Sequence, residues 1–399
     1  MYRPPQKMLE KYAKILVNFA LNSGKGVKKG EVIFVQAQES AKELLRELRI
    51  AVLKSGAHPI IHFIPDEWEK DFFEYANEDQ ISFFPDKYLK GRVDQMDHMI
   101  TILSSTNKQE LKDINHKKVI LGFNAMKPYI DWRHDKENAG KFTWTLGLFG
   151  TEAMAKEAGL SLEKYWEQII KGCYLDYENS IRKWRELFKQ IEALRTKLNK
   201  LDIKKLRIEA KDTDLIIGLD KNRQWLGGSG RNIPSFEIFT SPVCRQTEGY
   251  ISFTEPLYRY GNIIKNIRLE FKNGKVIKAR ASTGEKVLKE MIKTKGADMV
   301  GEFSLTDKRF SRITKFMAET LYDENVGGKY GNIHIALGSA YKDAFSGNIL
   351  KVKRDEWKKM GYNDSVVHTD IVSTSDRVVT ATLQNGNNLV IYKNGQFTI

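Results

Sequence analysis

The chain has 399 residues, of which 41% are apolar and 29% charged, with a formal net charge of +14 and a pI of about 9.4. This composition excludes a disordered chain, and the length is sufficient for two domains with separate cores. The lysines are spread along the chain among glutamates, as on solvated helix faces, so we expect no nucleic-acid partner.

The cysteine and hydropathy patterns indicate a cytoplasmic protein without a membrane partner. The only cysteines, Cys173 and Cys244, are far apart, which excludes a disulfide framework and a Cys-rich zinc site and fits a reducing compartment. No apolar run approaches the roughly 18 residues of a membrane span. The run Ile15–Leu21 faintly resembles a signal peptide, but Asn18 interrupts it and no A-x-A cleavage pattern follows.

The first part of the chain alternates strand and helix patterns, which predicts a sheet covered by helices. Ser40 and Glu43 match a capping box before an amphipathic helix. No phosphate-binding glycine fingerprint is present. The predicted strands are Glu31–Val35, Pro59–Ile64, Met99–Leu103 and Lys118–Phe123. Five histidines without metal-like spacing are interpreted as structural or surface residues: His58, His62, His98, His116 and His134.

The middle of the chain is predicted to be helical and the last part mostly antiparallel. Apolar spacing predicts helices at Thr151–Gly159, at Leu162–Lys171 with Ser161 as its cap, and from about Tyr177 to Leu201. Strand patterns start at Lys205, and Asn-Gly pairs between several of them predict hairpins. The predicted fold class is therefore α/β plus α+β. An N-terminal α/β domain with a helical extension covers 1–203, and a β-rich C-terminal domain covers 204–399.

Four strand-like segments of the second domain carry a side chain that can bind a metal. A buried, unpaired carboxylate is costly, so each acidic group there needs a charge partner or a cation. An ordinary ion pair, or a hydrogen-bonded core histidine, explains any one segment alone, whereas the five groups together favour a metal site. The segments are Asn232–Thr240 with Glu237, Met299–Leu305 with Glu302, Gly331–Tyr341 with His334, and Val366–Ser373 with His368 and Asp370.

The residue types indicate which metals and which chemistry. Mixed carboxylate and imidazole ligands suit Zn²⁺, Co²⁺ or Mn²⁺. Several carboxylates around two histidines favour two ions, which in such sites lie about 3.5–4 Å apart and share a water of lowered pKa. This arrangement serves hydrolysis. Neither an H-E-x-x-H helix nor a G-x-S-x-G elbow is present, which excludes the common mononuclear zinc protease and the serine hydrolase of that type.

Six motifs follow one another from about Asp212 to Ser373: NIPSFEIFTSP, TEG, GEFSLT, LYDEN, GNIHIALGSAY and HTDIV. In this order they resemble the motifs of the thermophilic metallo-aminopeptidase family, of the aminopeptidase T and aminopeptidase S type. The resemblance implies a cytoplasmic homodimer with an α/β N-terminal domain and a C-terminal domain that binds two divalent ions.

The resemblance also assigns roles to single residues. It implies that Glu302 bridges the two ions and that Tyr341 lies near them. Glu324, in LYDEN, matches a further carboxylate ligand, although NVGGKYGNI separates it from the histidine by more residues than in many relatives. Phe236 replaces a small or polar residue frequent in the family. The implied metal ligands are Glu237, Glu302, Glu324, His334, His368 and Asp370.

The predicted function is a metal-dependent aminopeptidase whose substrate is a peptide with a free N-terminus. One ion anchors the α-amino group, the other polarises the scissile carbonyl, and a bridging hydroxide attacks. The oxyanion forms against metal and the Tyr341 hydroxyl, and a carboxylate passes a proton to the leaving amine. Tyr341 and Glu302 are the predicted catalytic residues. The alternatives are another dinuclear metal hydrolase, such as an amidase or phosphoesterase, and a non-catalytic peptide-binding relative.

Overall fold

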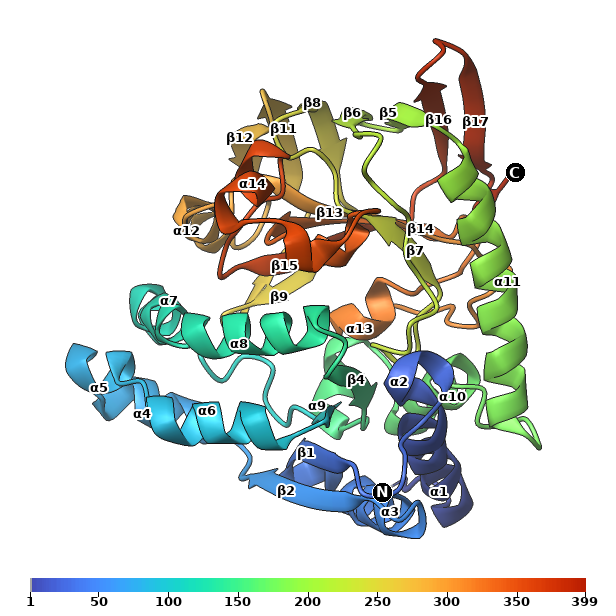
Figure 1. Cartoon of the computed structure of the whole chain (residues 1–399). Coiled ribbons are helices and arrows are strands. Elements are labelled where there is room, and N and C mark those ends of the chain that lie inside the picture. Colours follow the sequence, from blue (N-terminus) through green and yellow to red (C-terminus); the bar gives the residue numbers. More distant parts are fainter. Residues whose placement is uncertain (1) are drawn as a thin grey trace. The chain divides into compact units, whose positions relative to one another are not determined.

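The computed structural model describes residues 2–399, which form two compact units (Figure 1). Unit 1 contains residues 2–188, 228–235 and 317–321. Unit 2 contains residues 189–227, 236–316 and 322–399. No helix within residues 2–399 combines the length and the apolar character that a bilayer crossing demands.

Unit 1 is built on a parallel sheet of four strands in the order β2-β1-β3-β4. The central strands are apolar and largely buried, as expected for strands of a parallel sheet. The predicted α/β character of this part of the chain is confirmed. The strands are β1 (Val32–Gln38), β2 (His58–Ile64), β3 (His98–Leu103) and β4 (Thr143–Leu148).

The helices of unit 1 bury one apolar face each. In α3 the predicted stripe of Leu44, Leu48 and Val52 is fully buried. The predicted capping box before α3 is wrong, because the N-cap is Ala41 and no side chain caps the helix; the Ser40 hydroxyl donates to the carbonyl oxygen of Ser104 at 2.5 Å. The helices are α1 (Gln6–Ile15), α2 (Leu21–Gly24), α3 (Lys42–Lys54), α4 (Glu69–Tyr75), α5 (Glu78–Ser82), α6 (Asp86–Gln95), α7 (His116–Ala125), α8 (Lys127–Asn138), α9 (Glu152–Glu157) and α10 (Leu162–Gly172), with a π-helical turn at Leu16–Ala20 and a 3₁₀ turn at Glu39–Ala41.

One predicted strand is a helix. The segment Lys118–Phe123 lies in α7, where the Asn115 side chain accepts a hydrogen bond from the Lys117 backbone N–H and caps the helix. Val119 is the one residue of α7 that is fully buried, whereas a strand inside a parallel sheet would bury both faces. The fourth strand is β4, which the sequence analysis did not predict.

Unit 2 contains a large antiparallel sheet in the order β12-β11-β8-β6-β5-β16-β17-β18. The predicted Asn-Gly hairpins are confirmed at Asn273-Gly274, between β11 and β12, and at Asn394-Gly395, between β17 and β18. These strands are β5 (Ile203–Ala210), β6 (Thr213–Gly218), β8 (Thr247–Ser252), β11 (Arg268–Lys272), β12 (Lys275–Arg280), β16 (Arg377–Leu383), β17 (Asn388–Lys393) and β18 (Gln396–Phe397).

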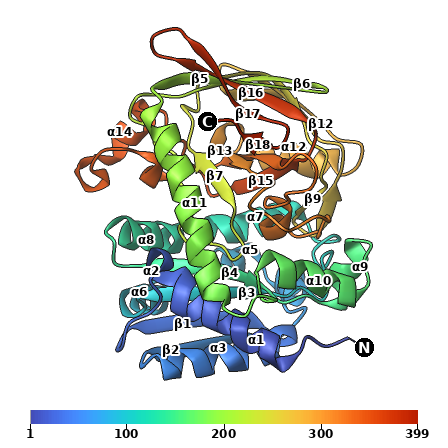
Figure 2. The ribbon, with the colours of Figure 1, turned by 90° about the vertical axis from the view of Figure 1, so that its right-hand side faces the viewer.

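A second antiparallel sheet of unit 2 has the order β15-β14-β13-β7 (Figures 1 and 2). Every residue of β7, β13 and β14 is buried, so both faces of this sheet are covered. Its strands are β7 (Glu237–Thr240), β13 (Val300–Thr306), β14 (Asn332–Gly338) and β15 (His368–Ser373).

Two helices contain residues of both units: the long helix α11 (Ser180–Lys200) and the short helix α13 (Thr320–Asp323). The remaining elements of unit 2 are a small hairpin and short helices. The others are β9 (Leu257–Arg259), β10 (Asn262–Ile264), α12 (Glu285–Lys293), α14 (Arg354–Lys359) and 3₁₀ turns at Lys342–Ala344 and Ile349–Lys351.

Candidate metal centre

One face of the four-stranded sheet gathers the acidic and imidazole groups. The register pairs His334 with Ser304, Ala336 with both Glu302 and Asp370, and Gly338 with His368. Residues paired across strands, and residues two apart along one strand, point to the same face. Glu237 pairs with Thr306, two residues beyond Ser304, and so joins this face from β7.

The opposite face of the same sheet is apolar. Phe303, Ile335 and Ile371 alternate with the polar residues along β13, β14 and β15, and each is at most 1% exposed. Burial of this face fixes the register, because a slip of one residue would turn the polar groups into the core. Burial of the apolar face therefore keeps five polar side chains, which come from segments far apart in the sequence, together on the opposite face.

Two small residues shape the middle of the polar face. Ala336 lies between Glu302 and Asp370 in its row, so no large side chain fills the space between the two acids. The register of β13 shifts between Val300 and Glu302, and a Cβ on the intervening Gly301 would lie 2.3 Å from the Ser339 carbonyl oxygen. Such a bulge redirects the side chain that follows it. Glycine at position 301 therefore allows Glu302 to reach both histidines.

The distances describe a compact cluster in which Glu302 lies between two imidazoles. Its Oε1 lies 3.5 Å from His334 Nε2, and its Oε2 lies 3.1 Å from His368 Nε2. Asp370 Oδ1 lies 3.9 Å from His334 Nε2 and 3.6 Å from His368 Nε2. Glu237 Oε2 lies 3.2 Å from His334 Nε2. Each ring therefore faces at least two carboxylates through its Nε2 atom.

Glu324 joins this cluster from the loop before β14. One of its carboxylate oxygens belongs to a group of potential ligand atoms, with His334 and Asp370, that all lie within 4.8 Å of one another. The loop leading to β14 is held by Asn332, whose side chain donates to the Val326 carbonyl at 2.8 Å. The loop between Glu324 and His334 therefore leaves the two side chains close together.

Three neighbours orient these side chains, and the sequence analysis did not assign them a role. The Ser304 hydroxyl donates to Glu237 Oε2 at 3.2 Å, and the Ser339 carbonyl oxygen lies 2.9 Å from His368 Nδ1. Asn325 Oδ1 accepts from the Phe236 backbone N–H at 2.7 Å, next to Glu237. The position of Ser304, two residues after Glu302 on a strand, is the signal that would have found it.

Electrostatics inside the cluster are those of carboxylates and imidazolium ions at close range. Burial opposes ionisation of Glu302, but hydrogen bonds from His334 and His368 outweigh it and lower the pKa of Glu302 to about 2. Burial also works against protonation of His368, yet Asp370 and then Glu302 raise its pKa to about 9. The pKa of His334 is raised well above its usual value by Glu237 and Glu302 in spite of burial. Burial first, then Glu237 and Asp370, raises the pKa of Glu324.

The donor set fits divalent cations. Asp370 Oδ1 is buried and accepts no hydrogen bond from any group in residues 2–399, although two imidazole nitrogens surround it. Since His368 Nδ1 faces a carbonyl oxygen and so carries the hydrogen, Nε2 of the neutral ring has a free lone pair towards Glu302. Buried acids in excess over bases are the usual environment of a bound metal ion.

Tyr341 lies beside the cluster. Its ring centroid is 5.1 Å from that of His368 and 5.5 Å from that of Phe239. Its backbone N–H donates to the Ser241 hydroxyl at 2.9 Å, which fixes the turn after β14. The structure therefore brings all the sequence-predicted site residues into one region of unit 2.

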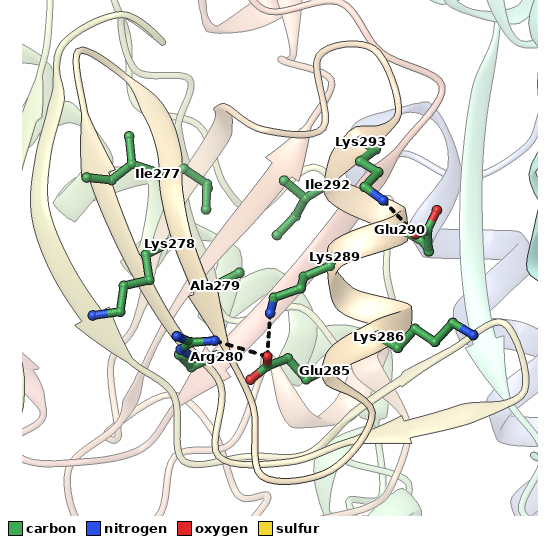
Figure 3. Close-up of a pocket in the computed structure, with 11 residues that line it drawn as sticks. Ile277, Lys278, Ala279, Arg280, Glu285, Lys286, Lys289, Glu290, Ile292 and Lys293 are labelled. Atoms are coloured by element: carbon green, nitrogen blue, oxygen red, sulfur yellow. Dashed lines mark hydrogen bonds and ion pairs between the residues drawn. The ribbon is translucent and has the colours of Figure 1, made fainter.

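A second hollow in unit 2, of about 610 Å³, lies between β12 and α12 and is lined by charged side chains (Figure 3). Five of these charged side chains are paired with one another. Glu285 contacts Lys289, and its Oε1 lies 3.3 Å from Arg280. Glu290 Oε1 lies 2.7 Å from Lys293 Nζ. Hydrogen bonding to Lys289 contributes most to lowering the pKa of Glu285 to about 2. The charges of these five side chains are therefore partnered within the protein.

Comparison with known proteins gives consistent matches along the whole chain. The profile of a family described as thermophilic metalloprotease (M29) matches residues 5–397. Aminopeptidase AmpS of Bacillus subtilis (strain 168) is 28% identical over 411 residues, and aminopeptidase PepS of Streptococcus thermophilus is 29% identical over 425 residues. Each match covers 98% of both chains. The solved structure of wild-type AmpT from Thermus thermophilus has a TM-score of 0.83 at 22% identity and covers 99% of this chain and 100% of its own, which shows a shared fold.

The raised pKa of His368 predicts how the metal-free protein responds to alkaline pH. The carboxylates of Glu302 and Asp370 stabilise the folded state while His368 is protonated. This contribution is complete below the ordinary pKa of about 6.5 and is lost as the pH rises through about 9. In EDTA, the melting temperature of the wild type should therefore fall relative to that of His368→Asn between pH 6.5 and pH 9. Parallel melting curves for the two proteins across this range would contradict the assigned contacts.

Proposed function

Because the chain belongs to the thermophilic metalloprotease (M29) family, and is therefore a peptidase, we propose that it is an aminopeptidase with a dinuclear metal centre. The observation that carries the proposal is the convergence of three groups of potential ligand atoms, from one sheet face and the adjoining loop, with the atoms of each group within 4.8 Å of one another. The names of the relatives AmpS and PepS support removal of N-terminal residues as the reaction.

The charges of the cluster favour two ions over one. Four carboxylates, those of Glu237, Glu302, Glu324 and Asp370, bring four negative charges when all are ionised. One divalent ion with neutral imidazoles would leave two buried negative charges, whereas two divalent ions balance all four. An unbalanced buried charge is strongly unfavourable. The proposed ions are Zn²⁺, Co²⁺ or Mn²⁺, which accept this mixture of oxygen and nitrogen donors.

The proposed ligands divide between two positions. Glu302 would serve both, since one of its oxygens faces His334 and the other faces His368. Glu237 and Glu324 lie on the side of His334, and Asp370 has its Oδ1 near both rings. When bound, two such ions supply a bridging hydroxide at neutral pH and polarise a peptide carbonyl.

The chain itself must bind the peptide and move protons. One of the carboxylates of the cluster must also pass a proton to the leaving amine. Tyr341, beside His368, supplies a hydroxyl for the developing oxyanion in this proposal. The buried apolar face beneath the cluster fixes these groups before a substrate arrives.

Loss of a proposed ligand is expected to abolish turnover without unfolding the chain. His368→Ala and Glu302→Gln should each lower kcat/KM by at least about 100-fold, because removing even an outer partner of a metal ligand costs about 10- to 100-fold. Metal content by mass spectrometry and activity are measured on the same purified samples. His58→Ala, at an exposed histidine of β2, is the matched control and should keep both. Full activity in either ligand variant would refute the assigned site.

Blocking the α-amino group is expected to prevent cleavage. Leucine p-nitroanilide should be hydrolysed, and its N-acetylated form should not, because the proposed site recognises a free N-terminus. A phosphate ester assayed in parallel separates peptidase from phosphoesterase activity. Faster hydrolysis of the phosphate ester, or equal cleavage of the acetylated anilide, would rule out the aminopeptidase proposal.

We also propose that the protein is a cytoplasmic homodimer. Support comes from the family resemblance and from two buried cysteines that form no disulfide within residues 2–399, as is usual in a reducing compartment. In light scattering the mass should be about twice the 46.0 kDa of one chain. A mass equal to that of one chain would argue against the dimer.

A further inference from the structure

Three of the four strands that carry the proposed ligands end at one place in unit 2. Thr306 is the last residue of β13, Asn332 is the first of β14, and Ser373 is the last of β15. Thr306 pairs directly with Asn332 across the sheet. Two side chains of the large sheet, Arg377 from β16 and Tyr392 from β17, reach these strand ends.

Arg377 joins the start of β14 to the end of β15. Its guanidinium donates to the Tyr330 carbonyl at 3.2 Å and to the Ser373 carbonyl at 2.8 Å. The residue is 2% exposed, so its guanidinium needs hydrogen-bond acceptors within the protein. The two carbonyl oxygens supply such acceptors and tie the guanidinium to both strands.

Tyr392 joins the end of β13 to the start of β14. Its hydroxyl donates to the Thr306 carbonyl at 2.8 Å and lies 3.2 Å from the Tyr330 carbonyl. The side chain is fully buried. Phenylalanine at this position would leave a buried carbonyl without its donor, which is a costly loss.

The C-terminal turn Asn394–Phe397 contacts the same strand ends from outside. The Lys308 N–H donates to the Gly395 carbonyl at 2.9 Å, and the Phe397 N–H donates to Asp307 Oδ2 at 2.9 Å. Asp307 is completely buried and also accepts from Arg309. Figure 2 labels β17 and β18, which flank this turn, next to the C-terminus.

Gly331 marks how close this contact is. Its φ is +57°, and a Cβ there would lie 2.1 Å from the Tyr392 hydroxyl and 2.3 Å from the Thr306 carbonyl. Only glycine tolerates both the backbone conformation and this approach. His334 follows three residues later, so a displacement of Gly331 would be passed along β14 to the imidazole.

The same strand end reaches the loop of Glu324. The Thr306 hydroxyl donates to the Glu324 carbonyl at 3.1 Å, while Thr306 pairs with Glu237 across β7. A shift of Thr306 would therefore reach two carboxylates of the cluster by separate routes.

We propose that Arg377, Tyr392 and the turn Asn394–Phe397 form a C-terminal clasp, which positions the metal ligands by fixing the ends of β13, β14 and β15. The inference rests on the proposed ligand set. The clasp residues act as positioning residues, since none of their side chains is among the potential ligand atoms. They set the distance between ligand-bearing strands, on which the affinity for the ions depends.

The test measures metal affinity rather than turnover. Metal-stripped protein is titrated with Zn²⁺ against a chromophoric chelator, and the visible spectrum of the Co²⁺-loaded protein is recorded. Tyr392→Phe should weaken Zn²⁺ binding by about 10-fold or more, and should alter the Co²⁺ spectrum, because the ligand geometry relaxes. Asp307→Asn, which loosens the turn from outside, should shift both readouts in the same direction.

Ile391→Val is the matched control. Ile391 is buried in the same strand as Tyr392, and its truncation lowers stability without removing a clasp contact. It should melt at a lower temperature than the wild type yet bind Zn²⁺ with wild-type affinity. Wild-type affinity and spectrum in folded Tyr392→Phe or Asp307→Asn would overturn the proposal, and so would equal weakening by Ile391→Val.

The wild type offers a reciprocal test that does not depend on how the variants fold. If the clasp affects Zn²⁺ binding, Zn²⁺ must in turn stabilise the clasp, because coupling between two sites is mutual. Zn²⁺ should therefore slow hydrogen exchange of the Phe397 and Lys308 amides, which make clasp contacts, more than that of the Val390 amide of β17, which makes none of them. Equal effects on all three amides would contradict the clasp. A wild-type chain that binds no Zn²⁺ would instead refute the proposed function, so the two failures are distinguishable.

Discussion

The confinement of three acidic groups and two imidazoles on one sheet face, with Glu324 reaching them from the loop before β14, is the constraint on which the rest of the site depends. Without cations, the nearby carboxylates raise the pKa values of both histidines, and burial followed by the neighbouring acids raises the pKa of Glu324, so each shift acts to limit the net charge of the cluster. With cations, the same atoms become ligands. A buried cluster of this kind does not arise from packing alone, because apolar residues of similar size would be less costly there. In the proposed function, bound cations offset this cost.

The surrounding structure serves to hold these groups at fixed separations. The apolar face of the sheet sets the register, the bulge at Gly301 turns Glu302 towards both rings, and Ala336 leaves the space between the acids open. The hydrogen bonds of Ser304 and Ser339 orient Glu237 and His368. Rigid positioning of this kind is what a hydrolytic site needs, since reorganisation at the moment of reaction would raise the barrier.

The strands of unit 2 and the face that their polar residues share could be predicted from the sequence. Apolar and polar residues alternate strongly in β14 and β15, and Asn-Gly pairs mark the hairpins. The sequence misled at Lys118–Phe123, where a short apolar run suits a strand or a helix equally and the cap at Asn115 decides. Of the neighbours of the cluster, it could have given Ser304, which lies two residues after Glu302 on a strand, but not Ser339 or Asn325. Contacts such as that of Arg377 with Ser373, or of Tyr392 with Thr306, depend on how two sheets meet, which no local pattern encodes.

The most direct test of the central claim is the number of divalent ions held by each chain. Protein purified without chelator, or reloaded with Zn²⁺ after stripping, is analysed by mass spectrometry of the metal together with the protein concentration. The charge balance of the cluster predicts two ions per chain, and none in a chain whose His334 and His368 are both replaced by alanine. An ion count of zero in the wild type, or an unchanged count in the double variant, would contradict the account.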